Sequence, residues 1–214
     1  MLFSPPKLYA IVDVDVCARV GWQPRELARA YLTGGARLLQ LRAKNLGGAA
    51  FLDLARAVVS DARGVDGKVI INDRADLAAL SGADGVHVGQ DDLSVADVRR
   101  IVGAAAVVGL STHTHAQLED AVRQPISYLA IGPVFGTSTK ETGYQAVGLQ
   151  MISDAHARAS PHGIAVVAIG GITLGRVKSV WEAGAASAAV IGDLLVDDPA
   201  ARVAQFVDAD TALR

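Results

Sequence analysis

The stretch IINDRADLAALSGADGVHVGQDDL, residues 70–93, contains twice over the pattern that decides the fold. A compact apolar run ends in Asp73, a short helix-forming segment follows, and a second apolar run at 85–88 leads to Asp92. Such runs are typical of strands buried in a parallel sheet, and parallel strands place their ends at the same edge. Two carboxylates at one edge can hold a hard cation. Taken singly, Asp73 also fits a helix cap and Asp92 a solvated turn.

The same alternation extends over the whole chain. Apolar runs predict strands at residues 8–12, 38–41, 68–71, 85–88, 107–110, 128–131, 165–169 and 187–191. Helical spacing and boundary residues predict helices at 24–32, 49–62, 76–80, 94–101, 116–122, 149–159 and 174–183, and from 199 towards 213. Ser94 and Thr173 are the expected N-caps of two of these helices.

Eight strands that alternate with helices predict an α/β protein, a single-domain (β/α)₈ TIM barrel over residues 1–214. No change in composition separates two halves of the chain. An open, doubly wound sheet is the main alternative. It calls for a glycine-rich turn after the first strand, where Asp13-Val14-Asp15 stands instead.

Composition narrows the class of protein. At 214 residues and 51% hydrophobic content, the chain can bury a large core as one domain. A net charge of −2 gives no support for a nucleic-acid surface, and no apolar stretch approaches membrane-spanning length. The single cysteine, Cys17, excludes an internal disulfide and is interpreted as a packing residue. The start of the chain lacks the pattern of a signal peptide, so we expect a cytoplasmic protein.

Polar side chains that break the apolar pattern gather after the predicted strands. They are Gln40, Arg42, Lys44, Asn72, Asp73, Asp92, Ser111, His113, Thr137, Thr139 and Lys140. In a barrel the carboxyl ends of the strands form one face, where barrel enzymes carry their sites. Carboxylates, cations and hydroxyls together suit a metal-bound, phosphorylated ligand. His87 lies on a strand and fits a satisfied interior histidine as well as a ligand contact.

Glycines follow the last two predicted strands. Gly170-Gly171 and Gly192 stand where many barrels bind phosphate with backbone N–H groups, although a tight turn alone explains them too. The segment 132–148 is longer than an ordinary connection between a strand and a helix, which favours a binding loop or lid.

Several short motifs now carry a family resemblance. LYAIVD, QLRAK, INDRADLA, GADGVHVGQDDL, GLSTHT, IGPVFGTSTK, VGL and AIGGIT occur in this order along nearly the whole chain. With them the chain resembles the thiamine phosphate synthase (thiamine-phosphate pyrophosphorylase) family. The resemblance implies a (β/α)₈ barrel that joins a hydroxymethylpyrimidine diphosphate to a hydroxyethylthiazole phosphate, releasing pyrophosphate.

The resemblance also implies a role for each matching residue. Asp73 and Asp92 would bind Mg²⁺, the implied cofactor, with Asn72 beside them. The diphosphate would be held, and its loss assisted, by Arg42, Lys44 and Lys140. The pyrimidine would be approached by Gln40, His87 and Ser111, with Ser111 also among the catalytic residues. The thiazole phosphate would be taken by Thr137, Thr139, Gly171, Ile191 and Gly192.

The expected partners are these small molecules, without nucleic acid or membrane, and the chain is compatible with a homo-oligomer. Gly192 stands where the family often has serine, and Asp193 stands where a small residue is usual. A phosphate bound at this turn therefore requires Asp193 to point away from the mouth of the barrel. Two alternatives are a thiazole tautomerase-like isomerase, with His113 as its acid/base group, and a non-catalytic barrel that binds thiamine precursors.

Overall fold

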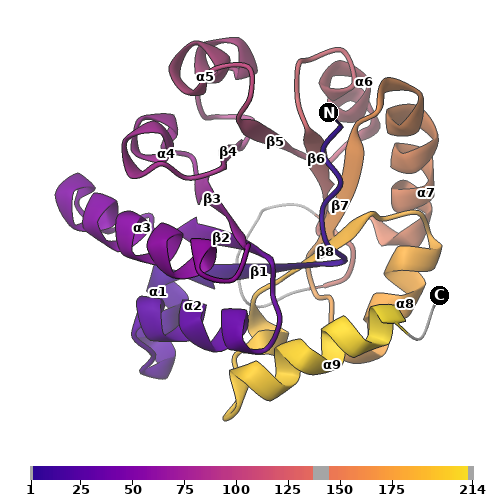
Figure 1. Ribbon diagram of the computed structural model, residues 1–214. Coiled ribbons are helices and arrows are strands. Elements are labelled where there is room, and N and C mark those ends of the chain that lie inside the picture. The colour runs from indigo at the N-terminus through magenta and orange to yellow at the C-terminus, as the bar shows by residue number, and fades with distance from the viewer. Residues whose placement is uncertain (1, 137–144, 212–214) are drawn as a thin grey trace.

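A computed structural model describes residues 2–136 and 145–211. It contains a closed barrel in which each strand pairs in parallel with the next and β1 pairs with β8, and helices surround the strands (Figure 1). The strands are β1 (Leu8–Asp13), β2 (Leu38–Arg42), β3 (Lys68–Asn72), β4 (Gly85–Val88), β5 (Val107–Thr112), β6 (Tyr128–Ile131), β7 (Ala165–Ile169) and β8 (Ser187–Val190). The predicted (β/α)₈ barrel is confirmed, and the doubly wound sheet is excluded because the sheet closes.

The helices cover the outside of the barrel in chain order (Figure 1). The α-helices are α1 (Val14–Val20), α2 (Pro24–Thr33), α3 (Gly48–Arg63), α4 (Ala75–Ser81), α5 (Val95–Val102), α6 (His115–Ala121), α7 (Gly148–Ala159), α8 (Leu174–Glu182) and α9 (Pro199–Thr211). Two short 3₁₀ turns are η1 (Ser160–His162) and η2 (Gly192–Leu194). Among the described residues, no helix has the length and apolar character needed to cross a membrane.

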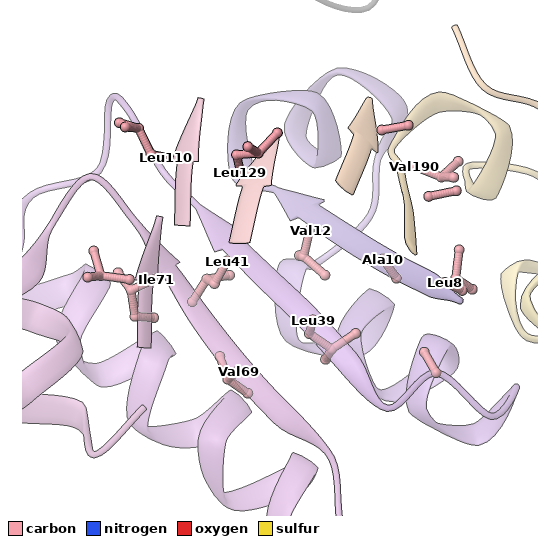
Figure 2. Packing of buried hydrophobic residues seen from close by; sticks show 14 of the residues in the cluster. Leu8, Ala10, Val12, Leu39, Leu41, Val69, Ile71, Leu110, Leu129 and Val190 are labelled. Atoms are coloured by element: carbon pink, nitrogen blue, oxygen red, sulfur yellow. The ribbon is translucent and has the colours of Figure 1, made fainter. Parts of the chain in front are cut away.

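Alternation along the strands divides the buried side chains into two sets. Side chains such as Leu39, Leu41 and Val69 belong to the large cluster between the strands and the helices, part of which is seen in Figure 2. Their neighbours, such as Leu38 and Ile70, belong to a smaller cluster that fills the inside of the barrel. Successive residues of a strand point to opposite faces, so every second position faces the interior.

Two local features differ from the expectations. Helix α1 directly follows β1, where no helix was predicted; Asp13 starts it by accepting hydrogen bonds from the N–H groups of Asp15 and Val16, both at 3.1 Å. Thr173 does not cap α8 with its side chain. The N–H of Leu174 instead donates to Asp193 Oδ2 at 2.9 Å, a partner from beyond β8. Ser94 does cap α5, as expected, by accepting from the N–H of Asp97.

Candidate active site

The carboxyl ends of β2 to β5 bring polar side chains to the mouth of the barrel, the end at which these strands stop. Arg42 and Asn72 are the last residues of β2 and β3, and Ser111 is the fifth residue of β5. Asn72 and His87 are only 8% exposed, so these side chains line the wall instead of reaching into solvent. Chain segments that are far apart in sequence thereby meet at one polar face.

Gln40 lies deeper than the sequence suggested. Although it was grouped with the polar side chains that follow the strands, it belongs to the predicted strand 38–41 and stands within β2, where it is 5% exposed and donates from Nε2 to the Tyr9 hydroxyl at 3.0 Å. The reason is register, because Gln40 lies opposite Ile11 of β1 and Ile70 of β3, one inward layer below Arg42. Gln40 is therefore part of the polar interior below the mouth.

Arg42 is held by a buried carboxylate that the sequence analysis did not single out. Its Nη1 donates to Oδ2 of Asp13, whose side chain is 4% exposed and whose other oxygen caps α1. Arg42 Nε is buried and has no hydrogen-bond partner among the described atoms. Buried donors normally find a partner, so this N–H is a candidate for an anionic ligand at the mouth. Helix α1 thus matters to the site, because its cap orients the arginine.

The two acids of the opening motif do meet. Lys44 Nζ lies 2.5 Å from Asp73 Oδ2, and Asp73 and Asp92 are close enough for each carboxyl group to affect the ionisation of the other. Asp92 Oδ2 also accepts from the N–H of Gly89 at 2.8 Å. The helix-cap interpretation of Asp73 fails, because no side chain caps α4 and its N-cap position is Arg74.

Burial raises the pKa of Asp73; Lys44 opposes this effect and the neighbouring carboxyl group of Asp92 adds to it. For Asp92 burial also acts upward, but the N–H of Gly89, the interaction with the Asp73 carboxyl group and the charges of Lys44 and His87 outweigh it and lower the pKa. Asp73 further adopts φ +63°, a left-handed backbone uncommon for a residue with a side chain. Two carboxyl groups crowded in this way, beside an ammonium group, are suited to a divalent cation.

No group of three or more metal-ligating side chains occurs in the described part of the chain. A cation at the Asp73–Asp92 pair would complete its coordination with phosphate oxygens or water, as Mg²⁺ commonly does. The two carboxylates therefore fit Mg²⁺ better than a metal such as Zn²⁺, which takes several nitrogen or sulfur ligands.

The other half of the mouth, at β6 to β8, is built from backbone. Gly170 and Gly171 have φ +101° and +63°, conformations that favour glycine. A Cβ on Gly170 would lie 2.5 Å from Pro133, and one on Gly171 would lie 2.6 Å from the carbonyl oxygen of Gly136. The glycines are thus required by the segment after β6, which lies against the turn. The sequence suggested that glycine stands here to let a phosphate approach the backbone. The packing against the segment after β6 is a second reason for glycine at these positions.

Asp193 is turned towards α8. Its Oδ2 accepts from the N–H of Leu174 at 2.9 Å and from Arg202 Nη1 at 3.1 Å. The carboxylate is thus paired with a guanidinium group and does not stand as an uncompensated negative charge beside Gly192. It also ties the turn after β8 to the start of the helix after β7. Asp193 therefore points away from the mouth of the barrel, as a phosphate bound at this turn would require.

Three predicted ligand residues, Thr137, Thr139 and Lys140, lie outside the described residues. His113, the acid/base group of the isomerase alternative, has its Nδ1 2.6 Å from the carbonyl oxygen of Gly132. Cys17 is buried, and burial together with the charge of Asp13 raises its pKa to about 11, which agrees with a packing role.

The residues that sequence reasoning missed are Asp13, Tyr9 and Tyr128. Each faces the barrel interior. Every second residue of a strand points to the same face, so Tyr9 and Asp13, four residues apart in β1, lie on the same side. The signal available in the sequence was a polar group at an inward position of an otherwise apolar strand. Polar residues were considered as site candidates mainly at the ends of the strands.

The family model described as thiamine monophosphate synthase matches residues 8–194. A thiamine-phosphate synthase from Koribacter versatilis is 42% identical over 94% of this chain and 94% of its own length. One from Anaeromyxobacter dehalogenans is also 42% identical, over 93% of this chain and 85% of its own.

Solved structures agree with these relatives. The thiamine phosphate pyrophosphorylase from Pyrococcus furiosus superposes with a TM-score of 0.84 at 26% identity, covering 95% of this chain and 96% of that one. A 3-hexulose-6-phosphate synthase superposes with a TM-score of 0.68 at 19% identity, over 95% of this chain and 99% of its own, and shows the fold alone.

Proposed function

The chain belongs to the thiamine monophosphate synthase family, and on that premise we propose how its mouth carries out the reaction. A 4-amino-2-methyl-5-hydroxymethylpyrimidine diphosphate is joined to hydroxyethylthiazole phosphate, giving thiamine phosphate and pyrophosphate. The bond from the pyrimidine methylene carbon to the diphosphate oxygen breaks, and its electron pair leaves with pyrophosphate. The thiazole nitrogen supplies the electron pair of the new C–N bond.

The observation that carries the proposal is the charged arrangement at the ends of β2 to β4. Two crowded carboxyl groups, the ammonium of Lys44 and the guanidinium of Arg42 face one polar end of the barrel. A diphosphate leaving group needs compensation of its negative charge, and cations with a metal supply it. An N–H of Arg42 that has no partner among the described atoms is available for this task.

Mg²⁺ is part of the proposal. Asp73 and Asp92 would hold it, and when bound it would neutralise charge on the diphosphate oxygens. Asp73 would then contact the metal in place of Lys44, and the ammonium group of Lys44 would be available to the phosphate. The raised pKa of Asp73 supports this exchange, because a carboxyl group that resists ionisation alone is stabilised as a carboxylate by a cation.

The thiazole phosphate is assigned to the backbone half of the mouth. The turns at Gly170-Gly171 and at Ile191-Gly192 stand after β7 and β8, the usual phosphate position in barrels. Thr137, Thr139 and Lys140 remain part of the proposed site by resemblance. Holding the thiazole nitrogen against the pyrimidine carbon is then a matter of positioning, and no enzymic nucleophile is needed.

The decisive test is pyrophosphate release with both substrates. We expect release only when both are present together with Mg²⁺, and none after EDTA. Release that is unchanged by EDTA would contradict the metal assignment. An isomerase would act on the thiazole phosphate alone without metal, and a binding protein would bind both molecules without release, so the same assay separates the alternatives.

A further inference from the structure

A continuous chain of hydrogen bonds crosses the inside of the barrel below the mouth. Gln40 Nε2 lies 3.0 Å from the Tyr9 hydroxyl, which lies 3.0 Å from the Tyr128 hydroxyl. The Tyr128 hydroxyl lies 3.0 Å from His87 Nδ1, and His87 Nε2 lies 2.9 Å from Ser111 Oγ. The five residues come from five different strands, so the chain connects β2 to β5 through the interior. We call it the tyrosine relay.

The centre of the relay is held by packing. The Tyr128 ring occupies the place that a side chain on Gly109 would take, since a Cβ there would lie 2.1 Å from Tyr128 Cζ. The imidazole of His87 stacks on the same ring, with centroids 5.6 Å apart and planes inclined by 13°. The ring of Phe3 also packs against Tyr128, with the two ring centroids 5.8 Å apart. The hydroxyl of Tyr128 is therefore fixed between its two partners.

The hydrogen bonds of the relay must all have the same donor-to-acceptor direction along the chain. Burial raises the pKa of both tyrosines, so each hydroxyl keeps its proton and donates one hydrogen bond. If Gln40 donates to Tyr9, then Tyr9 donates to Tyr128. Tyr128 in turn donates to His87 Nδ1. A neutral imidazole that accepts at Nδ1 carries its proton on Nε2 and donates it to Ser111.

Whether Gln40 donates or accepts at one end of the relay thus determines whether Ser111 accepts or donates at the other end. With Gln40 donating from Nε2, its Oε1 is left as an acceptor outside the relay, and the Ser111 hydroxyl keeps its own proton for another partner. Turning the Gln40 amide over would reverse every bond in the relay. Ser111 would then have to donate to His87 and could only accept from a ligand.

We propose that Tyr9 and Tyr128 are positioning residues that couple the hydrogen-bonding polarity of Gln40 to that of Ser111 and so select the pyrimidine. A 4-aminopyrimidine offers a donor amino group and an acceptor ring nitrogen, which match one acceptor and one donor at the two ends. A 4-oxo pyrimidine offers the inverse pattern. This inference rests on the proposed function and adds to it a basis for selectivity that lies outside the ligand contacts.

The first test measures selectivity. The KM of the amino substrate is compared with the inhibition constant of the 4-oxo pyrimidine diphosphate in wild type and in Tyr128→Phe, which removes only the bridging hydroxyl. We expect the preference for the amino compound to fall at least about tenfold. Without the bridging hydroxyl, Gln40 and Ser111 can reorient independently, so a 4-oxo pyrimidine leaves fewer buried polar groups without a partner and loses less binding free energy. Tyr9→Phe should have the same effect.

Tyr31→Phe is the matched control. Tyr31 is equally buried, but its hydroxyl has no hydrogen-bond partner among the described atoms and it belongs to the cluster outside the barrel. Its selectivity should equal that of wild type. An equal loss of affinity for both compounds in Tyr128→Phe, with unchanged preference, would overturn the proposal, because that is the result of a structural role alone.

The second test needs no substrate. A long-range ¹H–¹⁵N spectrum of protein labelled at histidine reports which ring nitrogen carries the proton, and His87→Gln identifies the signals. We expect His87 to be protonated at Nε2 in wild type and to become a mixture of tautomers in Tyr128→Phe. Protonation at Nδ1 in wild type would overturn the relay direction. A failure of the proposed function would appear instead as absent pyrophosphate release while the histidine spectra behave as expected.

Discussion

The half of the mouth at β2 to β5 presents charged side chains, whereas the half at β6 to β8 presents glycine turns. In the first half, the proposed function depends on groups such as Arg42 and Asp73, each held by a partner of opposite charge. In the second half, Gly170 and Gly171 meet the segment after β6 at distances that leave no room for a side chain. A substitution in the first half removes a charge, whereas a side chain added at Gly170 or Gly171 would displace the segment after β6.

In the proposed site, one ligand type, a phosphate ester, is therefore bound by two physical means. Side chains, together with the proposed metal, would supply full charges where a leaving group gains charge. Backbone N–H groups supply partial charges in a fixed geometry where a phosphate only has to be held. We therefore expect substitutions in the first half to affect turnover and substitutions in the second half to affect the KM of the thiazole phosphate.

The largest effect is expected from the acidic pair. Asp92→Asn should reduce Mg²⁺-dependent pyrophosphate release by about 1,000-fold or more, because a proposed metal ligand and its charge are lost. Asp91→Asn changes the adjacent, exposed acid and serves as the control with turnover near that of wild type. Steady-state rates over a Mg²⁺ titration give the comparison. Equal rates in the two variants would remove Asp92 from the site.

The next effect is expected at Arg42. Arg42→Gln should lower kcat/KM for the pyrimidine diphosphate by about 100-fold and destabilise the fold by about 3 kcal/mol, since Asp13 is left as an unpaired buried charge. The double variant Asp13→Asn with Arg42→Gln should recover much of the stability but none of the activity. Urea unfolding and kinetics separate the two roles. Recovery of both by the double variant would show that Arg42 acts only on the fold.

A smaller effect should reach the other half of the mouth. Gly171→Ala should raise the KM of the thiazole phosphate by about tenfold with little change in the KM of the pyrimidine substrate, because the new methyl group displaces the Phe135–Gly136 backbone. Gly82→Ala is the matched control, since Gly82 has a similar φ of +70° but lies on the turn into β4, at the far end of the barrel. If both variants raise that KM equally, the effect is one of general stability.

The smallest effect is expected from Asp193→Asn. The variant weakens the cap of α8 and the pair with Arg202, so we expect a loss of about 1 kcal/mol in unfolding free energy and a rise of a few-fold in the KM of the thiazole phosphate. Asp197→Asn, an exposed neighbour, should change neither. A lower KM in Asp193→Asn would mean that the carboxylate repels the phosphate in spite of its pairing.

Much of the fold could be predicted because its local patterns are strong. The strands 85–88, 128–131 and 165–169 were predicted with the bounds that the structure has, since each apolar run is bounded by turn residues. The meeting of Asp73 and Asp92 followed from one rule about parallel strands. The helix α1 was missed because its short, apolar sequence starts within one residue of the strand before it.

The sequence by itself determined the barrel and the end of it at which polar side chains gather, because alternation and strand-helix order are local properties repeated eight times. Only the tertiary structure decided which polar groups are partners. Tyr9 and Tyr128 are 119 residues apart, and Asp193 caps a helix that starts 19 residues earlier. Such contacts depend on the register of every strand between them and on closure of the barrel, so the residues that meet cannot be read from either segment alone.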